Sequence, residues 1–537
     1  MLALAHVLFP LALIVVPLAT LAGALGVLAL RRWPAVVATL GVAVAWVGAI
    51  ATFAAVCVTG AQRLPLLEAP FGGVIQPLLG LYADRLVAAL LVLVTTVSLA
   101  THIYARRAML GEPRYAVFFA RLSLVTALVT LVLLSDTLIM LFIFWALKGL
   151  TLATLLSHYR DVPAARAAGR AKFVTDLVGD GAFLLALGLA WTLFGTFSLG
   201  IILARAPQVA VQHGATLTVV ALLLTVAAMA KSALVPLQEW LPRTVEAPTP
   251  VSALMHAGLI NAGGFLLARL SPLFVAAPVA LWVTAAVGAA TMLFGTLVML
   301  TRSDIKTQLA YSTMGQMGFM ALECGLGAFA LAILHLIAHG FFKALLFLRS
   351  GQAVEDVSLT RRLSAEVAER EHDAIPAPAV AVALLAPLGA LAAYAALAGL
   401  PRGGLTILWL FAWLTAAQAL GLILRRWSMP RLLIGVAVLG ALTLYLAGAA
   451  AVETFLAPDV AVAPAPPLPL TTGLIVGIVA LGLATFGLKG RTGRAASGAV
   501  NALYIASLRG FYVEDAWMAL AGRLGSRGRA SNAERGS

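Results

Sequence analysis

Long apolar runs recur along the whole chain and alternate with short polar segments. Each run holds about 20 residues, which is enough for an α-helix to cross ~30 Å of membrane hydrocarbon. The pattern predicts about fifteen spans, at residues 5–30, 35–59, 82–105, 115–134, 137–158, 172–195, 215–236, 249–269, 274–300, 304–322, 327–349, 375–400, 404–424, 431–451 and 470–488. We therefore expect an all-α polytopic membrane protein with about 14–15 transmembrane helices.

Basic residues gather in every second connecting segment, which supports this number of spans. The rich segments carry Arg31 and Arg32; Arg106, Arg107 and Arg114; Arg160, Arg166, Arg170 and Lys172; Arg243; Arg302 and Lys306; Arg349, Arg361, Arg362 and Arg370; Arg425, Arg426 and Arg431; and the tail from Lys489. The segments between them carry at most one each, namely Arg63, Arg205, Arg269 and Arg402. Because cytoplasmic loops are enriched in Lys and Arg, we expect the N-terminus outside the cell and the C-terminus in the cytoplasm.

The composition agrees with a membrane protein and excludes several soluble classes. Of the 537 residues, 62% are hydrophobic and 11% are charged, against roughly 25% charged in a soluble domain. The net charge of +14 is explained by the basic cytoplasmic segments rather than by nucleic-acid binding. The two cysteines, Cys57 and Cys324, lie in apolar runs and indicate neither a disulfide framework nor a metal cluster. No phosphate-binding loop or soluble catalytic domain is recognisable, so we expect a transporter subunit rather than an enzyme.

The spacing of these segments divides the chain into five regions. We expect N-terminal helices, a helical core, a cytoplasmic connector, C-terminal helices and a basic cytoplasmic tail, at residues 1–80, 81–350, 351–374, 375–490 and 491–537. The Pro-rich residues 457–470 predict an extended external loop. Within the tail, the stretch NALYIASLRGFYVEDAWMALAGRL is typical of a segment that lies on the membrane surface or docks on a partner.

Three ionisable residues follow one another at helical spacing inside an apolar segment, HLIAHGFFKALLF. His335, His339 and Lys343 are four residues apart, so they share one helix face. Charges in the hydrocarbon are costly and therefore candidates for function. A neutral histidine accepts a proton on one nitrogen and donates from the other, which favours a proton-transfer row. Two other interpretations stay open here: zinc ligands, because i and i+4 is a metal-binding spacing, and histidines that pack against backbone.

A lysine precedes a run of prolines in the segment AAMAKSALVPLQEWLPRTVEAPTPVSALMHAG. Lys231 is followed by Pro236, and further prolines lie at 242, 248 and 250. Proline removes a backbone donor, so we expect a broken helix beside the lysine, which is how many transporters build an ion site. The alternative is a lysine that reaches the cytoplasmic interface. His256 opens the next span and joins the candidates.

Two aspartates and a further lysine lie in neighbouring predicted spans. Asp176 and Asp180 occupy positions i and i+4 of KFVTDLVGDGAFLLA, and Lys148 lies in FIFWALKGLTLATLL of the span before. A pair between Lys148 and Asp176 across the two helices would reduce the cost of burying both charges. Alternatively, the aspartates mark the cytoplasmic start of a helix, where carboxylates suit the helix dipole.

Several of these stretches resemble the proton-conducting antiporter-like subunits shared by respiratory complex I and the Mrp cation/proton antiporters. They are ATHIYARRAMLGEPRYAVFFARLSL, LLSDTLIMLFIFW, AKSALVPLQEWLP, EAPTPVSALMHA, SDIKTQLAYSTMGQMGFM and HLIAHGFFKALLFL. The resemblance covers roughly residues 80–350. It implies two inverted five-helix repeats, each with a broken helix, joined by a hydrophilic axis through the membrane. It also implies a proton path with Lys231 as proton-site lysine, His256 as bridging histidine, His335 and His339 as the linking pair, and Lys343 as central lysine.

The sequence departs from that family at two places. The glutamate expected beside Trp145 is Ala146 here, which leaves Lys231 without its usual partner; Asp176 or Asp180 is the candidate substitute. The region where the family carries a further ionisable residue, PAVAVALLAPLGALAAYAALAGL, has no charge, so this region lacks the residue that forms the usual exit of the path.

The variant HAGLINAGGFLLARLSPLF is similar to the DabB group within this family, the membrane subunits of DabA–DabB inorganic carbon transporters. That resemblance implies a subunit in the bacterial plasma (inner) membrane that couples a proton or Na⁺ gradient to a DabA-type partner. It implies no cofactor on this chain, and zinc on the partner. The alternatives are a complex I- or hydrogenase-type pumping subunit, an Mrp-type antiporter subunit, and a non-transporting scaffold that docks through the basic tail.

Overall fold

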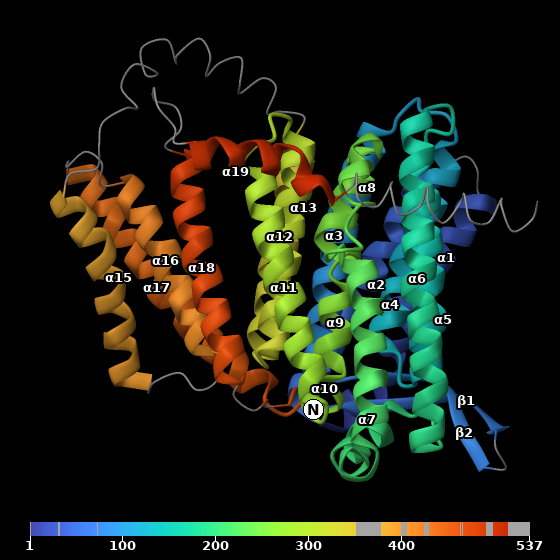
Figure 1. The fold of residues 1–537 in the computed structure, drawn as a ribbon. Coiled ribbons are helices and arrows are strands. Elements are labelled where there is room, and N and C mark those ends of the chain that lie inside the picture. Colours follow the sequence, from blue (N-terminus) through green and yellow to red (C-terminus); the bar gives the residue numbers. More distant parts are fainter. Residues whose placement is uncertain are drawn as a thin grey trace, which may run out of the picture.

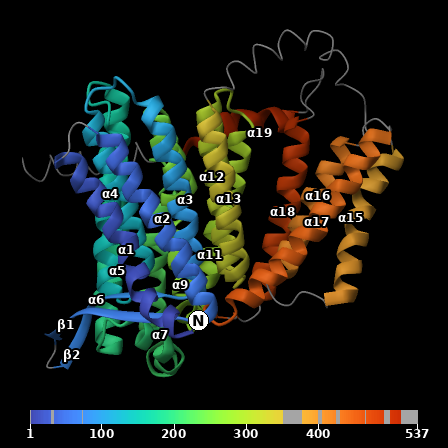
Figure 2. The ribbon, with the colours of Figure 1, turned by 180° about the vertical axis from the view of Figure 1, so that it is seen from behind.

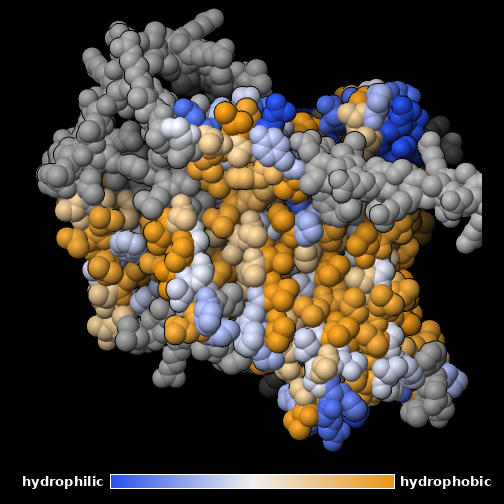
Figure 3. Space-filling model, in the orientation of Figure 1, coloured by the Kyte–Doolittle hydropathy of each residue, from blue (hydrophilic) through white to orange (hydrophobic). Residues whose placement is uncertain are grey.

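The computed structural model describes residues 2–29, 33–71, 74–350, 377–398, 405–423, 429–461, 463, 466–489 and 498–513. It shows a bundle of long helices that run side by side (Figures 1 and 2). An apolar surface covers the flank of the bundle, and hydrophilic residues gather toward its two ends (Figure 3). The expected connector, and the tail apart from residues 498–513, lie outside the described residues.

The helices agree with the predicted membrane spans. The first seven are α1 (Leu2–Ala29), α2 (Pro34–Thr59), α3 (Arg85–Ala108), α4 (Tyr115–Leu134), α5 (Leu138–Leu156), α6 (Pro163–Phe194) and α7 (Leu199–Ser232). The middle of the chain forms η1 (Pro242–Glu246), α8 (Thr249–Leu254), η2 (Met255–Leu259), α9 (Ala262–Arg269), α10 (Ser271–Val275), α11 (Pro278–Met299), α12 (Ile305–Gly325) and α13 (Phe329–Arg349). The last part forms α15 (Ala377–Ala398), α16 (Leu405–Ile423), α17 (Met429–Leu456), α18 (Leu468–Lys489), α19 (Gly498–Leu508) and η5 (Gly510–Tyr512).

Every predicted span coincides with a helix or, at 249–269, with a broken helix. Within the described residues, 11 helices are long and apolar enough to cross a membrane. The all-α polytopic fold is therefore confirmed. The two largest boundary shifts are at helix starts: α6 starts at Pro163 rather than 172, and α7 starts at Leu199 rather than 215, with a kink at His213.

A β-hairpin at one end of the bundle was missed by the sequence analysis (Figure 1). Strands β1 (Gln62–Phe71) and β2 (Val74–Ala83) pair antiparallel. Arg63 of β1 forms an ion pair with Asp136, which lies before α5, at 3.0 Å between Nε and Oδ1. Because the hairpin was missed, the predicted span 82–105 begins too early: β2 continues to Ala83, and α3 begins at Arg85. The Asp84 side chain caps the start of α3 by accepting a hydrogen bond from the Val87 amide.

The helix break predicted from the prolines lies directly after Lys231. Helix α7 ends at Ser232, and Ala233 adopts a left-handed conformation with φ of +52°. The chain then runs through η1 before α8 begins at Thr249. A second irregularity follows, because η2 is a π-helical turn between α8 and α9 and carries His256. Two interrupted helical segments therefore follow each other in the middle of the chain.

Helices α11 and α12 approach closely through glycines. A Cβ at Gly318 of α12 would collide with the Met292 backbone amide of α11, and a Cβ at Gly288 of α11 would collide with the Leu322 amide of α12. Gly295 and Gly325 make similar backbone approaches. Small residues at such positions allow dense packing inside a membrane, where no hydrophobic effect drives helices together. The pair forms a rigid support for α13.

The C-terminal helices α15–α17 stand beside this core (Figures 1 and 2). They pack on one another through small clusters, one of which contains Leu391, Ala416 and Leu442. Helix α19 lies across the ends of the upright helices, and Phe511, just after it, is 5.9 Å from Phe294 of α11 between ring centroids. Part of the tail thus packs on this chain itself.

The described residues of the Pro-rich connection between α17 and α18 are not helical, although the last three residues of the predicted loop, 468–470, already belong to α18. Its described residues are anchored at two points to the core. The Arg85 amide donates to Asp459 Oδ2 at 3.2 Å, and the Ala461 amide donates to Ser271 Oγ at 3.0 Å. Asp459 lies outside the spans, and burial, followed by the nearby charge of Asp84, raises the pKa of its carboxyl to about 6.

The glycine contacts of α12 lead to a stability prediction. We expect Gly318→Ala to lower the free energy of unfolding by about 1–3 kcal/mol, because the new methyl group overpacks against the α11 backbone. Gly188→Ala on α6 is the matched control, since a Cβ there meets nothing within 4 Å. Thermal unfolding of both variants in detergent tests this, and equal midpoints for the two would contradict it.

Candidate functional site

Two groups of buried ionisable side chains lie inside the helical core. The first, which we call the lysine–aspartate cluster, consists of Lys148, Lys172, Asp176, Asp180 and Lys231 on helices α5, α6 and α7. The second, the α13 row, consists of His335, His339 and Lys343. All three lysines of the cluster are almost completely buried, with 1–2% of their surface exposed. Burial of charges at this depth requires close partners.

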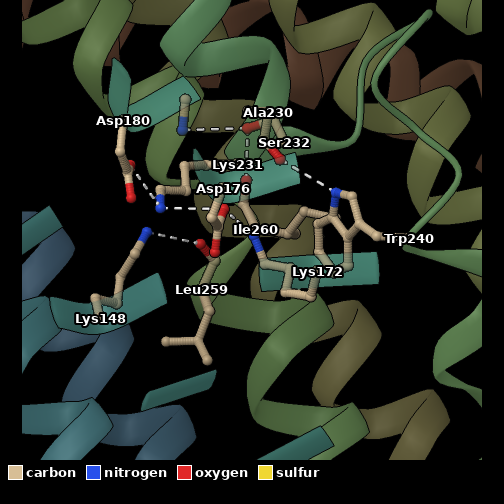
Figure 4. A network of polar contacts seen from close by, with 11 residues as sticks. Lys148, Lys172, Asp176, Asp180, Ala230, Lys231, Ser232, Trp240, Leu259 and Ile260 are labelled. Carbon is tan, nitrogen blue, oxygen red and sulfur yellow. Dashed lines mark hydrogen bonds and ion pairs between the residues drawn. The ribbon is translucent and has the colours of Figure 1, made fainter. Parts of the chain in front are cut away.

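Lys231 is held between two carboxylates of α6 (Figure 4). Its Nζ lies 3.0 Å from Asp176 Oδ1 and 2.9 Å from Asp180 Oδ1. Lys172, one turn before Asp176, donates to the same Oδ1 atom from the other side. Two ammonium groups therefore share one carboxylate oxygen. Position 146, where the family has a glutamate, is an alanine in this chain. Both Asp176 and Asp180 take the place of that glutamate as partners of Lys231.

The expected pair between Lys148 and Asp176 is wrong. Lys148 Nζ instead donates to the Leu259 carbonyl at 3.4 Å and lies 4.7 Å from the ring centroid of Trp145 (Figure 4). The cause is Gly149: its missing side chain leaves space that Asp176 and the Lys231 ammonium occupy, each 2.5 Å from where a Cβ would be. Lys148, the residue before Gly149 on α5, is directed toward the π-helical turn.

The alternative that the aspartates mark a helix start is also wrong. Helix α6 begins at Pro163, so Asp176 and Asp180 lie several turns inside it. The same early start moves Lys172 from the expected cytoplasmic segment into the helix, where its ammonium lies 4.2 Å from the ring centroid of Trp240. The i and i+4 spacing of Lys172 and Asp176 was the available signal for this pair.

The broken end of α7 is closed by side-chain hydrogen bonds. Trp240 Nε1 donates to the Ala230 carbonyl at 3.1 Å, which satisfies one of the last acceptors of the helix. Ser232 Oγ donates to the Ile260 carbonyl at 2.6 Å and accepts from the Gly263 amide at 3.1 Å. The break in α7 is therefore tied to the break between α8 and α9 (Figure 4). Lys231 is fixed next to both.

The α13 row lies on one helix, as the spacing predicts, and α12 supplies most of its partners. The rings of His335 and His339 meet edge-on with centroids 6.3 Å apart. Lys343 Nζ donates to Ser312 Oγ at 2.8 Å and to the Leu309 carbonyl at 3.4 Å. The two ring nitrogens of His339 have no hydrogen-bond partner among the described residues, although the side chain is buried.

His256 connects the two groups through the π-helical turn. Its ring stacks on Phe347 of α13, with centroids 4.3 Å apart and an interplanar angle of 12°. The same turn ends at Leu259, whose carbonyl accepts from Lys148. The turn thus contacts the lysine–aspartate cluster on one side and α13 on the other. A π-helical turn often marks a functional position in a helix.

Besides Lys172, the sequence did not reveal a second functional candidate, Glu323. Glu323 of α12 is fully buried, with 0% of its side chain exposed, and its Oε2 lies 2.9 Å from His335 Nδ1. The predicted span ended at 322, whereas α12 continues to Gly325. The shift of a few residues concealed the one carboxylate of this helix that faces the row. For the zinc alternative, no group of three or more His, Cys, Asp or Glu in the described residues is arranged to hold a metal.

The fold and the buried charges define an antiporter-like membrane subunit, and comparison with sequence families gives the same class. The family described as "NADH:quinone oxidoreductase/Mrp antiporter, TM" matches residues 135–423, more than half of the chain. The family "NADH-Ubiquinone oxidoreductase (complex I), chain 5 N-terminus" matches residues 72–119. The chain belongs to the NADH:quinone oxidoreductase/Mrp antiporter family.

Individual relatives cover parts of the chain. It is 41% identical over 299 residues to the probable inorganic carbon transporter subunit DabB1 of Halothiobacillus neapolitanus, covering 55% of this chain and 51% of that one. It is 40% identical over 281 residues to NAD(P)H-quinone oxidoreductase chain 5 of Synechocystis, covering 51% and 41%. The chain thus spans about half or less of the length of these curated relatives.

Solved structures of two membrane complexes share the fold. The Mrp complex from Dietzia sp. matches with a TM-score of 0.55 and 24% identity, covering 100% of this chain and 60% of that one. The archaeal membrane-bound sulfane sulfur reductase matches with a TM-score of 0.55 and 18% identity, covering 90% and 77%. At these identities the likeness concerns the fold.

The shared carboxylate of the cluster leads to a second stability prediction. We expect Asp176→Ala to lower the free energy of unfolding by about 3–5 kcal/mol, because it leaves two buried ammonium groups without their common partner. Asp161→Asn removes a carboxylate from an exposed position and is the control. Chemical unfolding in detergent measures both; an unchanged midpoint for Asp176→Ala would show that the ion pairs contribute little.

Proposed function

We propose that the protein conducts protons through its interior and couples this flow to inorganic carbon accumulation by a DabA-type partner. The observation that carries the proposal is the run of buried ionisable groups from the lysine–aspartate cluster, past the π-helical turn, to the α13 row. Chains of Asp, Glu, His and Lys inside a membrane are typical of proton relays. The proposed path contains Asp180, Asp176, Lys231, Lys148, His256, His339, His335 and Lys343.

Differences in exposure suggest how a proton enters this path. The side chain of Asp180 is 17% exposed, whereas those of Asp176 and Lys231 are 5% and 1% exposed. Asp180 is therefore the more exposed carboxylate of the cluster, and we take it as the point where a proton enters. With all five groups ionised, the cluster has three ammonium groups against two carboxylates, so it carries one positive charge in excess. Release of a proton from an ammonium group restores neutrality.

Lys148 is the group best placed to pass this proton onward. Its ammonium contacts a backbone carbonyl and a tryptophan ring rather than a carboxylate. That carbonyl belongs to the π-helical turn, which also holds His256 against α13. His339, with two buried nitrogens that have no partner in the described structure, is a suitable acceptor on the other side.

Protons fit the lysine–aspartate cluster better than Na⁺. Hard cations need several oxygen ligands, and here the Oδ1 atoms of both aspartates already face ammonium groups. We infer that this chain needs no cofactor of its own and that zinc resides on the partner. We also infer a bacterial plasma-membrane location with the N-terminus outside, from the alternation of basic segments.

The choice of partner rests on the relatives. The DabB1 relative is named as a subunit of an inorganic carbon transporter, and the HAGLINAGG stretch favours that group. The second candidate is a pumping subunit of a complex I-, hydrogenase- or Mrp-type assembly. It is supported by the 40% identity to NAD(P)H-quinone oxidoreductase chain 5.

The central lysine gives a direct test of conduction. In liposomes containing the full chain, we expect Lys343→Ala to reduce proton flux by about tenfold or more, since it removes a relay group that no neighbour replaces. A trapped pH dye reports the flux under a potassium diffusion potential. Arg349→Ala, at the exposed end of the same helix, is the control. Equal flux in the wild type and Lys343→Ala would refute the proposed path.

The partner is tested by purification of the full chain from its native membrane, followed by mass spectrometry. We expect one large zinc protein of DabA type to be recovered, together with bicarbonate accumulation that depends on Lys343. Recovery of quinone-reductase or Mrp subunits instead would assign the same conduction to the second candidate function.

A further inference from the structure

Glu323 occupies a position that the proposed path does not yet explain. Its side chain on α12 is fully buried, and Oε2 lies 2.9 Å from Nδ1 of His335 on α13. Its other oxygen, Oε1, has no hydrogen-bond partner among the described residues. A buried carboxylate with one free oxygen is costly to maintain. If Glu323 only linked α12 to α13, a neutral glutamine would be sufficient, because its amide oxygen can accept the same hydrogen bond.

His335 is positioned to exchange a proton with this carboxylate. Its Nδ1 faces Glu323, and its Nε2 lies 2.7 Å from Gln316 Oε1. Each nitrogen therefore has an oxygen within hydrogen-bonding distance, so each can donate to an oxygen when the ring carries two protons. Movement of the Nδ1 proton to Oε2 converts an ion pair into a neutral histidine and a carboxylic acid without displacing either side chain.

The location of Glu323 indicates toward which end of the bundle a proton would move. Glu323 lies near the end of α12, and the turn that follows contains Gly327, which packs against Ala463 of the connection between α17 and α18. The sequence predicts that connection to be external. Lys343 lies further along α13, toward its other end. The α13 row therefore runs from the interior toward the end of the bundle where Glu323 lies.

We propose that Glu323 is the last proton acceptor of the α13 row and forms the outlet of the path toward the outer end of the bundle. This inference rests on the proposed function and adds a residue to it. It replaces the exit that the uncharged residues 378–400 do not provide.

The steps balance one proton at a time. His339 takes up a proton from Lys148 across the π-helical turn or from the Lys343 ammonium, and the donor becomes a neutral amine. His339 then passes a proton to His335 by ring rotation or through one water molecule across the 6.3 Å between ring centroids. The His335 imidazolium passes its Nδ1 proton to Glu323 Oε2, and the resulting carboxylic acid releases it to water. Each donor returns to its basic form and is ready for the next proton.

The test measures proton flux of the full chain in liposomes for two substitutions at one position. We expect Glu323→Gln, which keeps the shape and the acceptor for His335 but cannot take up a proton, to reduce flux by about tenfold or more. Glu323→Asp keeps the acid and is expected to retain most of the flux with a shifted pH profile. Glu453→Gln, which removes an exposed carboxylate of α17, is the matched control and is expected to match the wild type.

A second readout does not depend on flux. Infrared difference spectra with changing pH are expected to contain a buried carboxylic acid band in the wild type that is absent in Glu323→Gln. Wild-type flux in Glu323→Gln, with Lys343→Ala inactive, would overturn the outlet role and leave the proposed function intact. Unchanged flux in Lys343→Ala would overturn the proposed function itself. If Glu323→Gln does not fold, an unshifted pH profile in Glu323→Asp overturns the outlet role.

Discussion

The structure depends on one constraint of the membrane interior: a polar group without water must find its partner inside the protein. Breaking α7 after Ser232 frees backbone acceptors, and the Trp240 indole donates to one of them, the Ala230 carbonyl. The Ser232 side chain donates to the Ile260 carbonyl and accepts from the Gly263 amide at the break between α8 and α9. Lys148 completes this arrangement by donating to the Leu259 carbonyl. The two helix breaks therefore support each other, and the charged cluster lies where they meet.

The same constraint explains why the lysines are not independent charges. Asp176 serves Lys172 and Lys231 with one oxygen atom, so a change in the protonation of either lysine alters the electrostatic environment of the other. Trp145 and Trp240 cover the ammonium groups of Lys148 and Lys172 and exclude water from them. Interactions between charges are stronger in such a low-dielectric site. The cluster consequently responds as a unit to the arrival or departure of one proton.

The sequence predicted the elements well and their polar contacts less well, for physical reasons. Apolar runs located the helices because burial in lipid is set by composition. The β-hairpin, whose first strand has no buried position among its described side chains, carried no comparable signal. Small errors in the predicted helix ends had large effects on the candidate site. They placed Lys172 at the edge of α6 and Glu323 just outside α12, so neither was recognised as a candidate. The partner of Lys148 depends on which face of α5 meets α6 and α7. Asp176 and Lys231 approach α5 at Gly149, and residue spacing in the sequence does not reveal that contact.

The π-helical turn has a consequence for how the two polar groups communicate. It presents a carbonyl to Lys148 on the α5 side and the His256 ring to Phe347 on the α13 side, within five residues. A regular α-helix makes i to i+4 bonds throughout, whereas a π turn widens the ring of bonded residues and weakens the backbone ladder locally. A change in the charge of Lys148 therefore acts on a backbone segment that can respond, and that segment is in contact with α13. The lysine–aspartate cluster and the α13 row are therefore connected through one short backbone segment.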